Sequence, residues 1–243
     1  MVDSGDNKNN SGMHGAALEI FGGLAKSYER VLQLATLAQD RHWKRWVYDR
    51  AGVKPGERVL DIGCGTCLLE EKLDRSGCHF VGLDLTEQMV RIGASKRLGS
   101  IEGLLLGDAE SLPFPEDTFD VVVSCYVPKY VEVTRFADEA SRVLRTGGRI
   151  ALYDFVRPRG RLSPLLKVYI QGVLPLVGCL LGLARSKSAI TFKNLPRIID
   201  EAKWNENVQE AFESEGIRTE ISKILSHGVV CAYSGKKISR ASL

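Results

Sequence analysis

The 243-residue sequence has no marked charge excess and no internal repeat. Lysine and arginine number 33 and aspartate and glutamate number 30, giving a net charge of +3. This balance does not require a nucleic acid or an anionic membrane as partner. Hydrophobic residues make up 44% and charged residues 26%, which excludes a mostly disordered or collagen-like chain. At roughly 150 residues per domain, the length predicts one domain, or one domain with an insertion.

Cysteine is also sparse, with six residues and no dense framework, which argues against a disulfide scaffold. Cys64 and Cys67 form a single C-x-x-C pair. No second pair follows to complete the four ligands of a structural zinc site, so we expect no metal. A redox role for this pair is the alternative. Residues 1–12 are polar, unlike a signal peptide, and we expect a cytoplasmic protein.

One nearly uncharged run, residues 168–184, tests the prediction of a soluble chain. A membrane-spanning helix needs about 20 apolar residues, whereas this run has 17 and contains Gln171 and Pro175. We interpret it as part of a helical cap that packs on the core or on a second subunit. The alternative is a surface that contacts an apolar substrate or a membrane. Membrane contact would make the protein peripheral at the membrane.

Hydrophobic spacing divides the chain into five parts. Residues 1–12 are predicted to be a disordered tail and residues 13–54 a helical lid, since apolar residues recur at helical spacing through 16–51. Residues 55–156 alternate short apolar runs with helical segments and form the predicted core. Residues 157–203 break this alternation and are predicted to be an inserted helical cap. Residues 204–243 resume with a helix and two strands. The expected strands are 58–62, 79–84, 103–106, 119–124, 149–154, 218–223 and 228–234, and the expected helices after the lid are 68–73, 86–94, 134–144 and 207–214.

Near-continuous apolar strands that alternate with helices predict an α/β fold with a mostly parallel, doubly wound sheet of seven strands. Ligands bind such sheets at the carboxyl ends of the strands. There the first strand ends in Asp61 and enters the glycine-spaced turn Gly63–Thr66. The turn has Leu68 where a dinucleotide site has its third glycine, and no lysine for a phosphate. S-adenosylmethionine (SAM) suits this turn, with Asp61 near its ammonium group and backbone N–H groups near its carboxylate.

Polar residues end three further strands. Asp84 ends the second, 23 residues after Asp61, where a carboxylate can accept both ribose hydroxyls of an adenosine; capping the following helix, which starts at Thr86, is the alternative. Asp108 follows the third strand, where it can hydrogen-bond the adenine amino group. Ser124 ends the fourth strand, beneath the methionine moiety. Their order along the sheet edge indicates an adenosyl-binding site.

The stretches VLDIGCGT, VGLDLTEQMV, GDAESLPFPEDTFDVVVS and RVLRTGGRIALYDF resemble those of class I SAM-dependent methyltransferases, which have a Rossmann-like fold. The nearest resemblance is to the ubiquinone/menaquinone biosynthesis C-methyltransferases (methyltransferase type 11-like). It extends to the lid, where it implies that Tyr28 lies over the cofactor. The pattern and the resemblance together give these expected cofactor-binding residues: Tyr28, Asp61, Gly63, Cys64, Gly65, Thr66, Asp84, Leu85, Met89, Asp108, Ala109 and Ser124.

The chain departs from this family after the fourth strand. The family commonly has a phenylalanine-glycine-x-arginine-asparagine run there, whereas this chain has Cys125-Tyr126-Val127-Pro128-Lys129-Tyr130. Pro128 or Lys129 thus replaces the arginine near the substrate. The general base stays unassigned among Asp154, Tyr126, His227, Lys129 and Tyr130. An ion pair of Asp154 with Arg157 or Arg159, and a plain loop role for His227, are the alternatives.

These observations predict a SAM-dependent methyltransferase acting on a small, apolar or prenylated acceptor, either a quinone precursor or a lipid. An RNA or protein methyltransferase is one alternative, although it would favour a strongly basic surface. A non-catalytic SAM-binding module is the other. We expect no nucleic acid partner. A homodimer and peripheral membrane contact through the cap both stay open.

Overall fold

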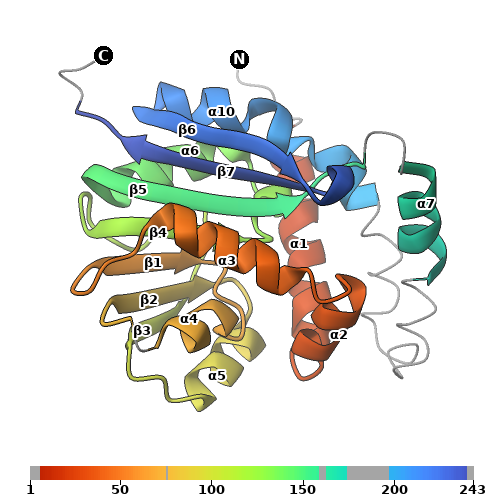
Figure 1. Cartoon of the computed structure of the whole chain (residues 1–243), viewed down its shortest axis with the longest axis horizontal. Coiled ribbons are helices and arrows are strands. Elements are labelled where there is room, and N and C mark those ends of the chain that lie inside the picture. Colours follow the sequence, from red (N-terminus) through yellow and green to blue (C-terminus); the bar gives the residue numbers. More distant parts are fainter. Residues whose placement is uncertain (1–5, 75, 159–162, 174–196, 240–243) are drawn as a thin grey trace.

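The computed structural model describes residues 6–74, 76–158, 163–173 and 197–239. Its centre is one seven-stranded sheet in the order β3-β2-β1-β4-β5-β7-β6 (Figure 1). Among the described strands, β7 is the one that runs opposite to the others, so its pairings with β5 and β6 are antiparallel and the remaining pairings are parallel. This arrangement confirms the predicted mostly parallel sheet. The strands are β1 (Arg58–Ile62), β2 (His79–Asp84), β3 (Ile101–Leu106), β4 (Phe119–Cys125), β5 (Leu144–Phe155), β6 (Ile217–Leu225) and β7 (Val230–Lys237).

The helical lid consists of three helices: a turn at residues 25–27 separates the first two, and Leu37 and Ala38, with positive φ angles of 50° and 61°, separate the second from the third. The first helix begins at Asp6, so residues 6–12 are helical where the sequence predicts a disordered tail. The helices are α1 (Asp6–Leu24), α2 (Tyr28–Ala35), α3 (Asp40–Ala51), α4 (Leu68–Leu73), α5 (Glu87–Ser95), α6 (Val133–Val143), α7 (Ser163–Val168) and α10 (Trp204–Ser214). A π-helical segment, Tyr169–Val173, continues α7.

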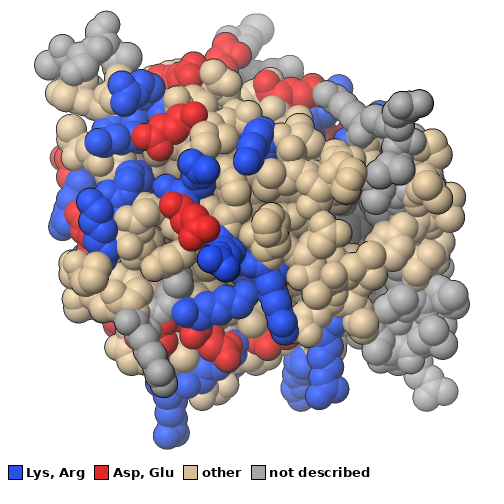
Figure 2. All heavy atoms as spheres, viewed as in Figure 1, with Lys and Arg blue, Asp and Glu red and all other residues tan. Residues whose placement is uncertain are grey.

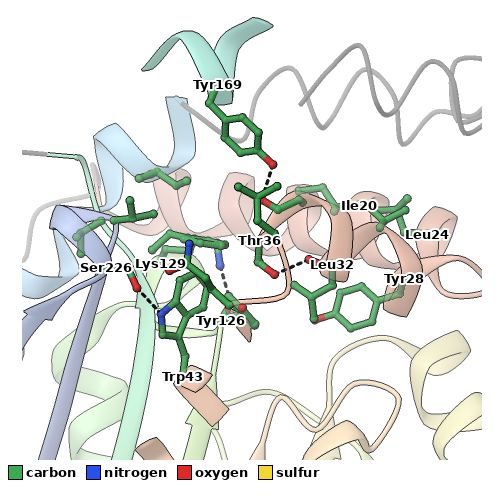
Figure 3. Close-up of a pocket in the computed structure, with 18 of the residues that line it drawn as sticks. Ile20, Leu24, Tyr28, Leu32, Thr36, Trp43, Tyr126, Lys129, Tyr169 and Ser226 are labelled. Carbon is green, nitrogen blue, oxygen red and sulfur yellow. Dashed lines mark hydrogen bonds between the residues drawn. The ribbon is translucent and has the colours of Figure 1, made fainter. Parts of the chain in front are cut away.

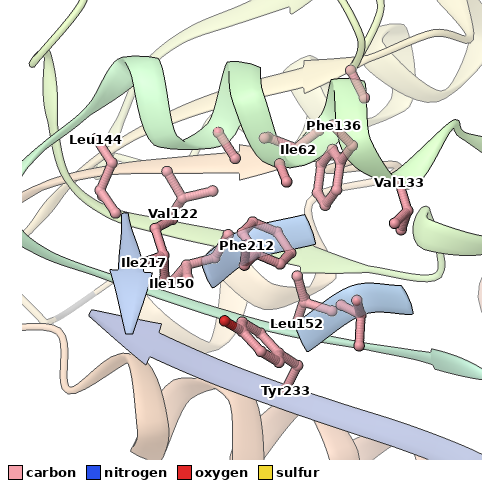
Figure 4. Close-up of a cluster of buried hydrophobic side chains, with 14 of the residues drawn as sticks. Ile62, Val122, Val133, Phe136, Leu144, Ile150, Leu152, Phe212, Ile217 and Tyr233 are labelled. Carbon is pink, nitrogen blue, oxygen red and sulfur yellow. The ribbon is translucent and has the colours of Figure 1, made fainter. Parts of the chain in front are cut away.

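Helices cover both faces of the sheet because its strands alternate their apolar side chains. Leu60 and Ile62 face the cluster that Phe136 of α6 and Phe212 of α10 fill (Figure 4). Val59, the residue before Leu60, faces the opposite cluster, which includes residues of α3 and α4. Removing these side chains from water supplies about 25 cal/mol per Å² of apolar surface, so this two-sided burial fixes the register of the sheet.

The predicted cap is described only in part. Helix α7 and the π-helical segment lie beside the lid (Figure 1), and the hydroxyl of Tyr169 donates to the carbonyls of Leu34 and Ala35 at 3.1 and 3.2 Å. Of the apolar run 168–184, residues 174–184 lie outside the described residues. None of the described helices combines the length and apolar character needed to cross a bilayer.

Helix α6 fixes the loop that follows β3. The guanidinium of Arg142 donates to the carbonyls of Leu112 and Phe114 at 3.0 and 2.7 Å. It also pairs with the carboxylate of Glu139, which in turn accepts the N–H of Leu112. The hydrogen bond from Arg142 holds the pKa of Glu139 below its ordinary value. The loop therefore keeps its shape through a charge-assisted network rather than through regular secondary structure.

We expect Glu139→Gln to lower the free energy of unfolding by about 1 kcal/mol at neutral pH, since partial exposure screens the pair. The folded-state pKa is depressed, so this contribution is present above the unfolded pKa, about 4.3, and is lost as pH falls through the folded value. Urea denaturation at about pH 7 and about pH 3 checks it: the gap between wild type and variant should close in acid. Glu210→Gln, at an exposed site on α10, is the control. A gap of equal size at both pH values would contradict the expectation.

Candidate active site

A small cavity lies at the carboxyl ends of β1 to β4, beneath α1 and α2. Strand β1, the glycine turn, β2 and the loop after β3 each contribute side chains or backbone to it. The structure brings most of the expected cofactor-binding residues to its surface: Tyr28, Gly63, Gly65, Asp84, Leu85, Met89, Asp108 and Ala109. Their grouping matches the predicted adenosyl site, although a role of each residue in binding stays a prediction.

The glycine turn is held to the end of β2 by backbone hydrogen bonds. The N–H groups of Gly63 and Cys64 both donate to the carbonyl of Leu83, at 2.7 and 3.1 Å. Gly63 has a φ of +79°, and a Cβ there would collide with the side chain of Val127. Only glycine therefore lets the turn pass beneath the loop after β4.

Asp84 joins the glycine turn to the start of α5. One carboxylate oxygen accepts the N–H of Gly65 and the other that of Thr86, both at 2.8 Å. Thr86 is the residue immediately before α5, so this bond orders the entry to the helix, and no side chain among the described residues caps the first turn of α5. Burial raises the pKa of Asp84. Each carboxylate oxygen can accept a further bond, which suits a pair of ribose hydroxyls.

The opposite end of the cavity is closed by a residue that sequence reasoning missed. His14 of α1 lies with Nδ1 3.6 Å from Asp108 and Nε2 3.3 Å from Glu110. Asp108 keeps its own orientation by accepting the N–H of Glu110 at 2.9 Å. His14 gave no signal in the sequence because it follows a polar stretch predicted to be a tail.

Four expected cofactor-binding residues lie behind the cavity surface, where other groups hold them. Thr66 donates its hydroxyl to Glu29 of α2 at 2.9 Å, and Ser124 donates to the carbonyl of Ile62 at 2.8 Å. The N–H of Cys64 is taken by Leu83, although the sequence predicts that it faces the ligand. Asp61 is buried, and burial raises its pKa. These residues shape the cavity from beneath instead of lining it.

A second cavity, of about 450 Å³, adjoins the first and is almost wholly apolar. It lies between the lid helices, the ends of β5 and β7, and Leu165 and Tyr169 of the cap (Figure 3). Its volume falls in the range of small-molecule sites, about 300–1,000 Å³. The two cavities share one wall, which we call the aromatic wall: Phe21, Tyr28, Tyr126 and Tyr130.

Contacts between rings hold the aromatic wall together. The ring of Phe21 meets those of Tyr28 and Tyr130 edge to face, with centroids 5.9 and 5.7 Å apart. Helix α1 supplies Phe21, the start of α2 supplies Tyr28, and the segment after β4 supplies the other two. The wall therefore forms only when the lid is closed over the sheet.

Asp154, a candidate base, is fully buried at the end of β5. Its carboxylate accepts both the ammonium of Lys129, at 2.8 Å, and the backbone N–H of Lys129, at 2.9 Å. The expected ion pair therefore exists, but its partner is Lys129; Arg157 pairs with Asp200 instead, and Arg159 lies outside the described residues. Burial lowers the pKa of Lys129 and raises that of Asp154.

Tyr126, the second candidate, has its hydroxyl directed away from the cavities. It donates to a carboxylate oxygen of Asp40 at 2.9 Å, and the same oxygen accepts from Tyr153 and Lys44 at 3.0 and 2.7 Å. Burial raises the pKa of Tyr126, which keeps it a neutral phenol. Its φ of +68° is rare for a bulky residue, and such backbone strain often marks functional sites.

His227, the third candidate, is exposed at the edge of the larger cavity. It and Ser226 adopt positive φ angles of 58° and 47°. The hydroxyl of Ser226 accepts the indole N–H of Trp43 at 2.7 Å (Figure 3), which ties this turn to α3. The imidazole of His227 thus remains a candidate base at the cavity edge.

Comparison with known proteins agrees with this geometry. Residues 7–237 match the model of the ubiE/COQ5 methyltransferase family. The chain is 31% identical over 229 residues to a demethylmenaquinone methyltransferase of Tropheryma whipplei, covering 91% of this chain and 92% of that protein. It is 30% identical over 228 residues to the ubiquinone/menaquinone biosynthesis C-methyltransferase UbiE of Geobacter sulfurreducens, covering 90% and 87%.

Solved structures with low sequence identity share the fold. A SAM-dependent methyltransferase from Aquifex aeolicus aligns with a TM-score of 0.59 at 17% identity, covering 86% of this chain and 98% of that one. The strand order, the glycine turn and the family match support the same conclusion. The chain belongs to the ubiE/COQ5 methyltransferase family and is a SAM-dependent methyltransferase.

Proposed function

We propose that the enzyme methylates a quinol-type ring that carries an apolar tail. The aromatic wall is the observation that carries this proposal, because it joins the cavity lined by the expected cofactor-binding residues to a larger apolar one. A flat ring at the wall would meet the methyl donor, and the cavity of about 450 Å³ would take the tail. The relatives are a demethylmenaquinone methyltransferase and a ubiquinone/menaquinone biosynthesis C-methyltransferase, which supports the same acceptor class.

SAM supplies a methyl group on a sulfonium, already activated for displacement. The chain's own task is to align the acceptor and exclude water, and alignment alone can be worth ~7–11 kcal/mol. We infer that Asp84 holds the ribose and that the glycine turn leaves room for the methionine moiety. The aromatic wall orients the acceptor ring and keeps the site dry.

Lys129 is proposed to stabilise negative charge on the acceptor. Its ammonium lines the apolar cavity and lies 4.3 Å from the ring centroid of Tyr130. Asp154 and the carbonyl of Tyr126 each accept one of its N–H groups at 2.8 Å, which leaves a third donor. A ring carbon becomes nucleophilic when a ring hydroxyl loses its proton, and a fixed cation favours that anion. Lys129 would thus serve where the resembling family has arginine.

Surface charge favours a small acceptor over RNA or protein. On the face drawn in Figure 2, basic and acidic side chains intermingle. An RNA-modifying enzyme is expected to carry a continuous basic patch. Among the coloured residues, the area beside α7 in the same view is mainly uncharged, which fits an apolar substrate.

Incubation with labelled SAM and a demethylated naphthoquinol, with and without a prenyl tail, tests the acceptor. We expect label in the organic phase, with kcat/KM at least about 10-fold higher for the tailed compound, because the tail buries additional methylenes worth ~0.8 kcal/mol each. Label in added RNA or protein alone would refute the proposal.

The paired variant Lys129→Met with Asp154→Asn tests the role of the cation and avoids leaving a lone buried charge. We expect kcat to fall about 100-fold or more while SAM affinity is kept, because the lost charge acts on the acceptor. Lys236→Met, at an exposed site on β7, is the control. Unchanged kcat in the paired variant would remove Lys129 from the mechanism.

Asp84→Asn tests the proposed ribose contact. The change keeps the shape of the side chain but removes the charge, and its amide cannot accept on both sides. We expect the Kd for SAM to rise about 10- to 100-fold, since hydrogen bonds to charged groups are worth ~1.5–3 kcal/mol. Calorimetric titration measures it, with Glu87→Gln on α5 as the matched control. An unchanged Kd would mean that the ribose lies elsewhere.

We further propose that the opening of the larger cavity rests on a membrane surface. Four apolar side chains that are 48–69% exposed border it: Leu37 and Leu165, which line the cavity, and Leu34 and Val168 nearby. Such clustered exposure is typical of interaction sites. A tailed acceptor would then enter directly from the lipid. Whether the chain also forms a dimer stays a prediction.

Co-sedimentation with phosphatidylcholine–phosphatidylglycerol vesicles tests this contact. We expect Leu37→Ser with Leu165→Ser to reduce the bound fraction several-fold, because each buried leucine contributes ~1.5–3 kcal/mol. Activity on a short-tailed, water-soluble acceptor should stay within about 2-fold, since the cofactor cavity is untouched. Ile224→Ser, an exposed apolar residue on β6, is the control. Equal binding by wild type and the double variant would exclude this surface.

A further inference from the structure

A cluster of metal-binding side chains lies directly behind the glycine turn. One donor atom each from Cys64, Cys67 and Glu70 falls within 4.8 Å of the others, and all three residues are buried. Cys64 lies in the glycine turn, Cys67 is the residue immediately before α4, and Glu70 lies in the first turn of α4. This spacing places one carboxylate and two thiols around a common point, on the side of the turn away from the cofactor cavity.

Buried polar atoms without partners lie at the same point. Both carboxylate oxygens of Glu70 and Oδ1 of Asp61 lack a hydrogen-bond donor among the described residues. Glu70 is 0% exposed and Asp61 is 3% exposed. The two carboxyl groups face one another, and two acceptors can be satisfied only by a shared proton or a cation. A buried charge without compensation is costly, so one bound cation would satisfy both carboxylates in place of a shared proton.

We propose that Cys64, Cys67 and Glu70 bind one zinc ion, and that Asp61, which faces Glu70 but lies outside this three-residue cluster, supplies the fourth ligand after a small shift. Ligands at 2.0–2.3 Å from a tetrahedral ion lie about 3.3–3.8 Å apart, so the present cluster needs to contract by about an ångström. Two thiolates favour zinc over magnesium or calcium, which prefer oxygen ligands alone. The ammonium of Lys44 acts electrostatically on both carboxyl groups and would offset part of the negative charge of this ligand set.

The neighbouring backbone provides the space for this site. A Cβ built on Gly82 of β2 would lie 2.8 Å from the sulfur of Cys64, and one on Gly93 of α5 would lie 2.5 Å from that of Cys67. Glycine at both positions therefore makes room for the sulfur atoms. Zinc here would join β1, the glycine turn and α4, and so stabilise the turn that shapes the cofactor cavity. Its role is structural and independent of the acceptor.

Elemental analysis of the full chain, produced with zinc in the medium, tests the site. We expect about one zinc per chain, and replacement by Co²⁺ should give the intense visible bands of tetrahedral cobalt together with thiolate charge-transfer absorption. Cys67→Ser and Glu70→Gln should each lower zinc retained after dialysis against a chelator at least about 10-fold, because each removes one ligand. Cys78→Ser, which replaces a buried thiol outside the cluster, should retain full occupancy.

Two results would overturn the proposal. One is wild-type protein that is folded by circular dichroism yet carries no stoichiometric metal and gives no thiolate–cobalt absorption. In that case the carboxyl pair shares a proton. The other is a native mass 2 Da below the reduced value with Cys64 and Cys67 linked, which would identify a disulfide. Glu70→Gln, nearly identical in shape, keeps the test valid if the cysteine variants fail to fold. SAM titration of the same samples separates a loss of metal from a loss of the cofactor site.

Discussion

The active site depends on the attachment of the glycine turn to the end of β2. Three N–H groups of the turn, those of Gly63, Cys64 and Gly65, are taken by the carbonyl of Leu83 and the carboxylate of Asp84. Parallel pairing of β1 with β2 brings these groups to the same edge. Asp84 therefore holds the turn in place, and the proposed ribose contact would use its remaining lone pairs. A substitution in the glycine turn is therefore expected to affect the position of Asp84, and a substitution of Asp84 to affect the turn.

The sheet edge and the lid helices together form the cofactor cavity. The sheet edge alone supplies the turn and the strand-end acids, whereas α1 and α2 supply His14, Phe21 and Tyr28. The aromatic wall thus consists of residues from the lid and from the segment after β4, and both cavities need it. Because chemistry and substrate binding share this wall, opening the lid would release both ligands and admit water. This coupling is consistent with an enzyme whose main tasks are alignment and exclusion of solvent.

The sequence predicts the sheet well because its strands are short, apolar and bounded by turn residues. The expected β1 and β2 match the observed bounds, and the expected residues of the glycine turn and strand ends meet at one edge. The hydrogen-bond partners of individual side chains were harder to predict from the sequence. Ser124 and Thr66 lie in the predicted places but bond to Ile62 and Glu29, since a strand end fixes position and not the partner of a hydroxyl. Asp40 gave no signal, because a charged residue on an amphipathic helix is normally exposed.

Buried charge is concentrated around the two cavities. Lys129 pairs with Asp154, and Lys44 with Asp40, each at distances below 3 Å. Removing ions from water costs several kcal/mol apiece, and an apolar replacement of similar volume is often as stable or more so. In keeping with that cost, burial outweighs attraction in setting the pKa of Lys129 and of Asp154. Stability alone therefore does not account for these pairs. Their positions do, since the ammonium of Lys129 lies 4.3 Å from the ring centroid of Tyr130 in the aromatic wall, while Asp40 accepts the hydroxyl of Tyr126, whose backbone has a φ that a bulky residue disfavours.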